Sequence, residues 1–199
     1  MKFHIVVIYF NIIMGLRGRT NLTEEHFFFI TTTVVNFTRV FIKDLYCEIL
    51  INNIKHYQLR YKFNMLAYVI MPSHFHWILE IDTKYGTVSD IMRDIKKYSA
   101  WDIMEKIEKE NPELMNIFFR EAVKYSGHKR KFWMQRFDDE VIRNGKMFWT
   151  KLNYIHWNPV EAGLVIKPEY YKFSSARNYV NNDHSIIKVD TSFAGVEMK

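Results

Sequence analysis

The chain has 199 residues, 48% of them hydrophobic and 17% aromatic, so it can bury a real core and is not a disordered chain. Its single cysteine, Cys47, excludes a disulfide framework or a cysteine-based metal site within one chain, and fits a reducing, cytoplasmic location. With 7 glycines and 4 prolines, a many-turned β protein is disfavoured. The net charge of +6 is a mild indication of a polyanionic partner.

The first residues, MKFHIVVIYFNIIMG, are apolar, but the run is too short to span a bilayer and lacks a small-residue cleavage site. We therefore expect residues 1–16 to be an extension, with Met14 as a candidate start of translation, and we expect no membrane partner. A single domain is expected over 17–180. It carries an inserted basic segment at about 105–135 and is followed by an irregular tail at 181–199.

The hydrophobic pattern predicts the order β-α-β-β-α-insertion-β-α. Runs rich in β-branched and aromatic residues indicate strands, and apolar residues at i, i+3, i+4 and i+7 indicate helices. The strands are predicted at 26–37, 63–72, 74–81 and 136–143, and the helices at 40–59, from Thr87 onward, and at 145–158. Without the insertion, the first six elements make the split β-α-β arrangement of an α+β, ferredoxin-like fold. That fold has an antiparallel sheet with helices on one face, and here a further helix follows the last strand. Such a fold hosts many functions.

Two histidines, His74 and His76, stand one residue apart in MPSHFHWILEI, the second strand of a predicted hairpin. Because side chains alternate between the faces of a strand, both histidines share one face. The alternate residues Phe75, Trp77 and Leu79 are apolar and are expected to pack on the helices. The histidines therefore belong to the open face of the sheet, where a metal or phosphate contact is favoured over a structural role. Two imidazoles need a third ligand from elsewhere.

One candidate for the third ligand is Glu80, which shares the face of the histidines. The spacing His-x-His-x3-Glu resembles the first cupin motif, but cupins are all-β and glycine-rich, and this chain is too helical. A solvated carboxylate at the end of a strand is the simpler interpretation of Glu80.

The other candidate lies in NYIHWNPVEAG, on the last predicted helix. Tyr154 and Asn158 point the same way because they are four residues apart, with Lys151 beside them, whereas His156 points elsewhere. An apolar stripe would dock this helix, and it consists of Phe148, Leu152 and Ile155. An amide oxygen suits a hard cation, and a tyrosine hydroxyl could attack a phosphate polarised by that cation. From this segment alone, an exposed tyrosine and a helix-ending asparagine before Pro159 remain the simpler interpretation. Tyr98, with Asp102 at i+4, competes for the nucleophile role, but it continues an apolar stripe, so core packing explains it.

Basic residues dominate between 124 and 151, and aromatic residues such as Phe132 and Trp133 are interleaved with them. Basic and aromatic side chains together suit single-stranded or distorted nucleic acid, which offers phosphates and stackable bases. The alternative is a solvated basic loop over core aromatics. The predicted DNA contacts are Lys129, Arg130, Lys131, Arg136, Arg143 and Lys151.

The motif MPSHFHWIL resembles the His-hydrophobe-His motif of the single-tyrosine HUH transposases. The stretch FWMQRFDDEVIRNGKMFWTKLNYIHWNPVEAGLV resembles the C-terminal half of the REP-associated tyrosine transposases, and YIHWNPVEAGLV is its most specific part. The later KFSSARNY also fits, so the resemblance covers about 17–180. Ser73 stands where an asparagine is frequent and Trp77 where a smaller aliphatic is usual, and neither change removes a ligand.

The resemblance implies metal-dependent nicking and strand transfer of single-stranded DNA near hairpins, through a covalent 5′-phosphotyrosine. It implies that His74 and His76 bind Mg²⁺ or Mn²⁺, that Tyr154 is the nucleophile, and that Asn158 is the amide ligand. It leaves open whether the protein acts as a monomer or a homodimer. A non-catalytic nucleic-acid-binding module on the same fold is the alternative, and a histidine-metal hydrolase that uses Glu80 is a third hypothesis.

Overall fold

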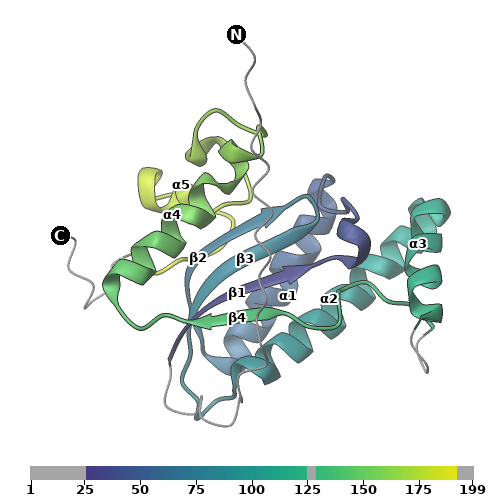
Figure 1. Ribbon diagram of the computed structural model, residues 1–199, viewed down its shortest axis with the longest axis horizontal. Helices are drawn as coiled ribbons and strands as arrows, with labels where there is room; N and C mark the ends of the chain where they lie inside the picture. The colour runs from purple at the N-terminus through teal and green to yellow at the C-terminus, as the bar shows by residue number, and fades with distance from the viewer. Residues whose placement is uncertain (1–25, 125–128, 192–199) are drawn as a thin grey trace.

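A computed structural model describes residues 26–124 and 129–191, and the expected N-terminal extension with Met14 lies outside these ranges. Within them the chain forms an antiparallel sheet of four strands in the order β2-β3-β1-β4 (Figure 1). The strands are β1 (Phe27–Thr33), β2 (Asn64–Met71), β3 (His74–Glu80) and β4 (Asp138–Val141).

Helices lie on both faces of this sheet. Helices α1 and α2 pack against each other behind it in the view of Figure 1, and α4 packs on β2 and β3 in front. The helices are α1 (Asp44–Tyr61), α2 (Val88–Glu110), α3 (Pro112–Val123), α4 (Gly145–Glu161) and α5 (Ala176–Asn181), with 3₁₀ turns at Val35–Phe37 and Pro168–Tyr170. Among the helices that the structure describes, none has the length and apolar composition needed to cross a membrane.

The strand order identifies the topology. Strand β3 lies between β1 and β2, and β1 lies between β3 and β4, with every neighbouring pair antiparallel. The units β1-α1-β2 and β3-α2-β4 are therefore two split β-α-β units that interlock. This confirms the predicted α+β, ferredoxin-like fold and the position of a helix after the last strand.

Local signals explain where the elements begin and end. At the start of α2, the Thr87 hydroxyl and the Asp90 carboxylate cap each other's backbone amides. Strand β1 stops at Thr33 instead of continuing to the expected residue 37, because Asn36 and Phe37 adopt left-handed backbone angles, with φ of 54° and 52°. The inserted segment, expected only as charged and mixed, contains the end of α2 and all of α3.

Two hydrophobic cores occupy the two faces of the sheet. The larger core lies between the sheet and helices α1 and α2, and it includes Phe75, Trp77 and Leu79, as the alternation predicted. The smaller core lies under α4, where Leu152 and Ile155 meet apolar side chains of β2 and β3. Helix α4 thus packs mainly on β2 and β3 on the face that carries the histidines, and among the described residues no helix lies over β4 there (Figure 1).

The C-terminal segment covers the outer edge of β2. The amide of Ile70 donates to the carbonyl of Phe173 at 2.9 Å, and the amide of Ser175 donates to that of Tyr68 at 2.8 Å. After α5 the described residues form no helix or strand, yet Ile187 and Val189 are buried in the larger core. An otherwise exposed edge strand is thereby covered.

Candidate active site

The histidine pair lies at the start of β3, on the face of α4. In the register of the sheet, His74 stands opposite Thr33 and His76 opposite Thr31, so these side chains share one face. The two imidazole rings are 4.8 Å apart between centroids and meet edge to face. His76 is buried, at 4% exposure, and His74 is partly buried. The two rings are thus close enough to share one ligand.

Each imidazole uses its Nδ1 for a contact within the protein. Nδ1 of His76 lies 2.8 Å from Oγ1 of Thr31, and Nδ1 of His74 lies 3.2 Å from Oγ of Ser73. Such partners fix the orientation of a ring and leave Nε2 for a ligand. Thr31 is a residue that the sequence analysis missed, and so is Ser73 in this role.

Burial keeps both imidazoles neutral. It lowers the pKa of His74 to about 4. It also lowers the pKa of His76 well below its ordinary value, and the charges of His74 and Lys151 lower it further. A neutral imidazole is the form that binds a divalent cation. The pair therefore has the protonation state that a metal site requires at neutral pH.

Tyr154 lies over this pair. Its hydroxyl oxygen is 3.4 Å from Nε2 of His76, and the two rings are 5.1 Å apart between centroids. The ring of Phe29, from β1, stacks on His76 and meets Tyr154 edge to face. Tyr154 is 43% exposed, so part of its side chain is accessible from outside. Tyr154 therefore lies close to the histidine pair, as expected from the resemblance.

Asn158 lies one helical turn after Tyr154 and hydrogen-bonds to it through its side chain. Burial raises the pKa of the Tyr154 phenol, the hydrogen bond with Asn158 lowers it, and the charge of Glu161 raises it, with a net increase. At neutral pH the phenol is therefore protonated, and it needs nearby positive charge to become a nucleophile.

Lys151 lies about one helical turn before Tyr154 on α4, and its charge acts on His76. Its Nζ atom lies 4.6 Å above the ring of Phe29, and it pairs with the Glu140 carboxylate of β4 at 2.5 Å. Phe29 and Glu140 are opposite each other in the sheet, on the histidine face. Lys151 was predicted from the sequence, whereas its partner Glu140 was not.

The competing candidates lie elsewhere. Glu80 is at the other end of β3, about 13 Å along the strand from His76 at the usual rise per residue, and it accepts a hydrogen bond from Asn64. His156 is bonded to Ser175 at 2.9 Å and points away, as expected. Tyr98 belongs to α2, on the opposite side of the sheet. It is exposed and stacks beside Tyr57, so the core-packing explanation of Tyr98 is incomplete.

The donor set around Tyr154 fits a hard divalent cation with open positions. Two neutral imidazoles offer Nε2, and the amide of Asn158 adds an oxygen donor on the neighbouring helix. Among the described residues no three His, Cys, Asp or Glu side chains cluster as a metal site. A metal ion held by the two histidines would therefore need a further ligand of another type, such as an amide.

The six predicted DNA contacts do not form one surface. Lys151 stands at the candidate active site, while Arg130 and Lys131 lie beside α2, on the other side of the sheet. The remaining three, Lys129, Arg136 and Arg143, are exposed before and after β4. The sequence could place these residues in one basic segment, but not on one face.

The comparisons with known proteins agree with this geometry. The family described as "Transposase IS200 like" matches residues 25–155, well over half of the chain. A Haemophilus influenzae protein named as a REP-associated tyrosine transposase is 23% identical over 157 residues, covering 79% of this chain and 83% of its own. A solved REP-associated tyrosine transposase bound to a REP hairpin shares the fold, with a TM-score of 0.60, 21% identity, and coverage of 88% of this chain and 92% of its own. The chain therefore belongs to the IS200-like transposase family.

Proposed function

We propose that this transposase nicks single-stranded DNA and transfers the strand through a covalent 5′-phosphotyrosine on Tyr154. The main support for this proposal is the distance of 3.4 Å between the Tyr154 hydroxyl and Nε2 of His76. These two residues are 78 positions apart in the chain. His74, His76 and Asn158 would hold one divalent cation, Mg²⁺ or Mn²⁺.

That cation, when bound, would withdraw charge from the scissile phosphate and favour the ionised phenol. The Tyr154 oxygen attacks phosphorus in line with the leaving group, the bond from phosphorus to the 3′ oxygen breaks, and that oxygen leaves as a 3′-hydroxyl after gaining a proton. Lys151, beside Phe29, adds positive charge to the same site. A 3′-hydroxyl then attacks the phosphotyrosine and regenerates Tyr154, so bonds are exchanged without an external energy source.

The proposed substrate is single-stranded DNA that carries a hairpin near the cleavage site. A net charge of +6 suits a polyanion, and the solved relative of the same fold is bound to a REP hairpin. One chain supplies all four site residues, which favours activity without a tyrosine helix exchanged between subunits. A homodimer with independent sites is compatible with the same arrangement.

The alternative is a module that binds nucleic acid on the same fold and does not cleave it. Such a module has no need of a tyrosine hydroxyl beside neutral imidazoles, whereas a nuclease needs this combination. The two functions predict different results: binding alone survives EDTA and the substitution His74→Ala, but adduct formation does not.

The test uses single-stranded DNA from the flanks of the chain's own gene, incubated with the protein and Mn²⁺. A covalent adduct is expected as a slowly migrating band on a denaturing gel, and EDTA should abolish it. Tyr154→Phe should give no adduct while keeping the wild-type circular dichroism spectrum, and Tyr98→Phe is the matched control that should still react. An adduct of normal yield from Tyr154→Phe would refute the assignment.

A further inference from the structure

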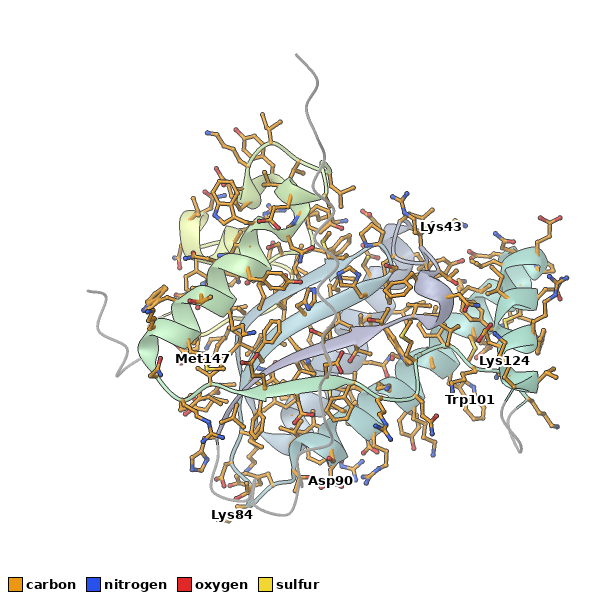
Figure 2. All side chains as sticks on the ribbon, in the orientation of Figure 1. Lys43, Lys84, Asp90, Trp101, Lys124 and Met147 are labelled. Atoms are coloured by element: carbon orange, nitrogen blue, oxygen red, sulfur yellow. The ribbon has the colours of Figure 1, made fainter. Side chains whose placement is uncertain are left out.

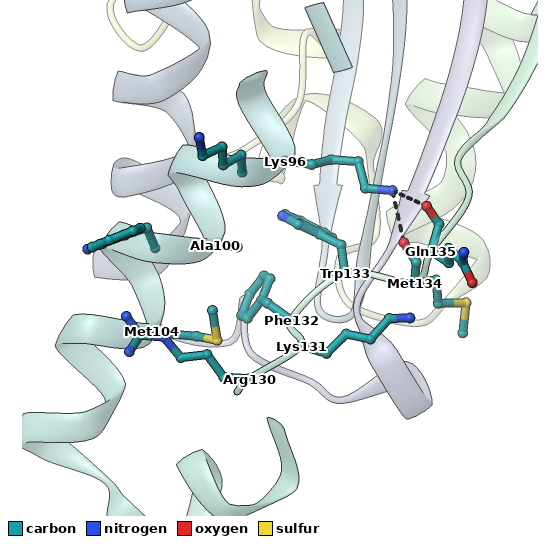
Figure 3. A pocket seen from close by; sticks show the side chains of 11 residues that line it. Lys96, Ala100, Met104, Arg130, Lys131, Phe132, Trp133, Met134 and Gln135 are labelled. Atoms are coloured by element: carbon teal, nitrogen blue, oxygen red, sulfur yellow. Dashed lines mark hydrogen bonds between the residues drawn. The ribbon is translucent and has the colours of Figure 1, made fainter. Parts of the chain in front are cut away.

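A pocket of about 470 Å³ lies between α2 and the chain segment that leads into β4 (Figure 3). Its size is within the range of small-molecule sites, roughly 300–1,000 Å³. Two of its walls, Phe132 and Trp133, belong to the core beneath α1 and α2. The pocket is therefore on the side of the sheet opposite His76 and Tyr154. In Figure 2, Trp101 lies near α3, at the other side of the view from Met147 of α4.

The lining combines an apolar floor with a cationic rim. The apolar floor of the pocket is formed by three buried side chains, Met104, Phe132 and Trp133. Four cations surround this floor, and none of the described residues that line the pocket is acidic. The cations are Lys96, Lys97, Arg130 and Lys131. An occupant of this pocket should carry both a flat apolar surface and negative charge.

Hydrogen bonds hold the walls in place. Nζ of Lys96 donates to the carbonyls of Met134 and Gln135 at 2.8 and 3.2 Å, as the dashed lines of Figure 3 mark. The indole of Trp133 donates to the buried hydroxyl of Ser99 at 3.2 Å. A site whose walls are fixed before binding loses less conformational entropy on binding.

Trp101 is the large aromatic side chain at the mouth of this pocket. Its indole is 55% exposed, and the guanidinium of Arg130 lies 5.7 Å from the ring centroid. Arg130 also pairs with Glu108 at 3.3 Å, which restrains the guanidinium beside the indole. An exposed indole with an arginine at its side is an arrangement on which nucleobases stack.

We propose that this pocket binds one unpaired nucleotide of a DNA strand. Its base would stack on Trp101, and its phosphates would contact Lys97 and Lys131. This inference rests on the proposed function, because it takes single-stranded DNA as the substrate. It adds a contact on the opposite side of the sheet from the cleavage chemistry. An apolar peptide would make no use of the cationic rim, and a small inorganic anion would leave the indole unused.

The experiment measures binding in the full chain carrying Tyr154→Phe, so that no adduct forms. The ligands are labelled single strands of about 12 nucleotides, in a series that moves the fluorescent base 2-aminopurine along the strand. Polarisation of the label gives the affinity, and quenching of 2-aminopurine gives the stacking. The variants are Trp101→Ala, Trp101→Phe and Lys97→Ala. Lys55→Ala, at an exposed position of α1, is the control for the loss of one charge.

We expect one position of 2-aminopurine to be strongly quenched. Trp101→Ala should remove this quenching and weaken binding about tenfold, while Trp101→Phe should retain most of both. Lys97→Ala should weaken binding and lower the salt dependence by about 0.7 in the logarithmic slope. If Trp101→Ala binds and quenches as Lys55→Ala does, the pocket is not a nucleotide site. An effect of Lys97→Ala alone would equally exclude stacking in the pocket.

The outcome of this binding experiment does not depend on the proposed cleavage chemistry. The nuclease proposal fails if the protein with Tyr154 intact forms no adduct, whatever the binding data show. The nucleotide pocket fails if the binding variants equal their control, even where adduct forms normally.

Discussion

The hydroxyl of Tyr154 and Nε2 of His76 lie 3.4 Å apart, although 78 residues separate them in the chain. The contact depends on the way α4 docks on the sheet. Leu152 and Ile155 of α4 are buried against β2 and β3, and this orients Tyr154, which lies between them in the chain, over the histidines. The chemistry proposed for Tyr154 is therefore coupled to the packing of a small hydrophobic core.

Leu152→Ala tests this coupling. Removing a buried leucine side chain should lower the free energy of unfolding by about 2–5 kcal/mol, and the loosened helix should reduce adduct formation as well. The neighbouring exposed Asn153 provides the control, since Asn153→Ala should change stability by less than about 0.5 kcal/mol. Urea denaturation and the adduct assay measure the two effects. A destabilised Leu152→Ala with an unchanged adduct rate would mean that docking of α4 does not position Tyr154.

Thr31→Val tests the support of His76. The valine keeps the shape of threonine but removes the Oγ1 that lies 2.8 Å from Nδ1 of His76. Loss of such a partner usually costs about 10–100-fold in metal affinity or activity, and we expect this for Mn²⁺-dependent adduct formation. Thr31→Ser retains the hydroxyl and should retain most of the activity. Equal activities for the two variants would show that the hydroxyl has no part in the site.

The pair Asn158→Ala and Glu80→Gln identifies the third ligand. Asn158 hydrogen-bonds to Tyr154, whereas Glu80 is at the far end of β3, bonded to Asn64. Asn158→Ala should therefore weaken Mn²⁺ binding, and Glu80→Gln should leave it unchanged. Electron paramagnetic resonance of free Mn²⁺ gives both affinities directly. The reverse pattern would favour the histidine-metal hydrolase in place of the transposase-type site.

The parts of this arrangement that follow from local periodicity could be predicted from the sequence. Alternation along MPSHFHWILEI placed His74 and His76 on one face, whereas the position of Tyr154 over them was expected only from the family resemblance. Thr31 could not be predicted, because its contact depends on the register between β1 and β3. That register is set by long-range packing and turn geometry.

Two helices, α3 and α4, also differ from what the sequence predicted. Helix α3 was missed although Asn111 and Pro112 form a recognisable start, with the Asn111 side chain capping the amide of Leu114. Helix α4 continues past Pro159 to Glu161, where the sequence predicted an end. Proline removes one backbone donor, yet α4 continues through Pro159, whose side chain is buried.

Cys47 provides a test of the larger core through pH. Burial, with a smaller contribution from the charge of Asp44, raises the pKa of its thiol to about 12. In the unfolded chain the thiol ionises near pH 8.5, so above that pH the unfolded state releases a proton that the folded state keeps. The contribution of this thiol to the free energy of unfolding is fully present below about pH 8.5. It is lost as the pH rises toward 12, by up to about 1.4 kcal/mol per pH unit.

The measurement compares the wild type with Cys47→Ala by urea denaturation at several pH values from about 8 to about 10. The wild type should lose stability relative to Cys47→Ala as the pH rises, because the alanine variant has no thiol to ionise. Parallel pH profiles of the two proteins would indicate that the thiol is accessible to solvent in the folded chain.

The most direct test of the account is to map the covalent bond between protein and DNA. The adduct formed with hairpin-bearing single-stranded DNA is digested with nuclease and protease, and the modified peptide is identified by tandem mass spectrometry. The account predicts a 5′-phosphotyrosine on Tyr154, formed only with Mg²⁺ or Mn²⁺ present. A modification on another residue such as Tyr98, or an adduct that forms equally in EDTA, would contradict it.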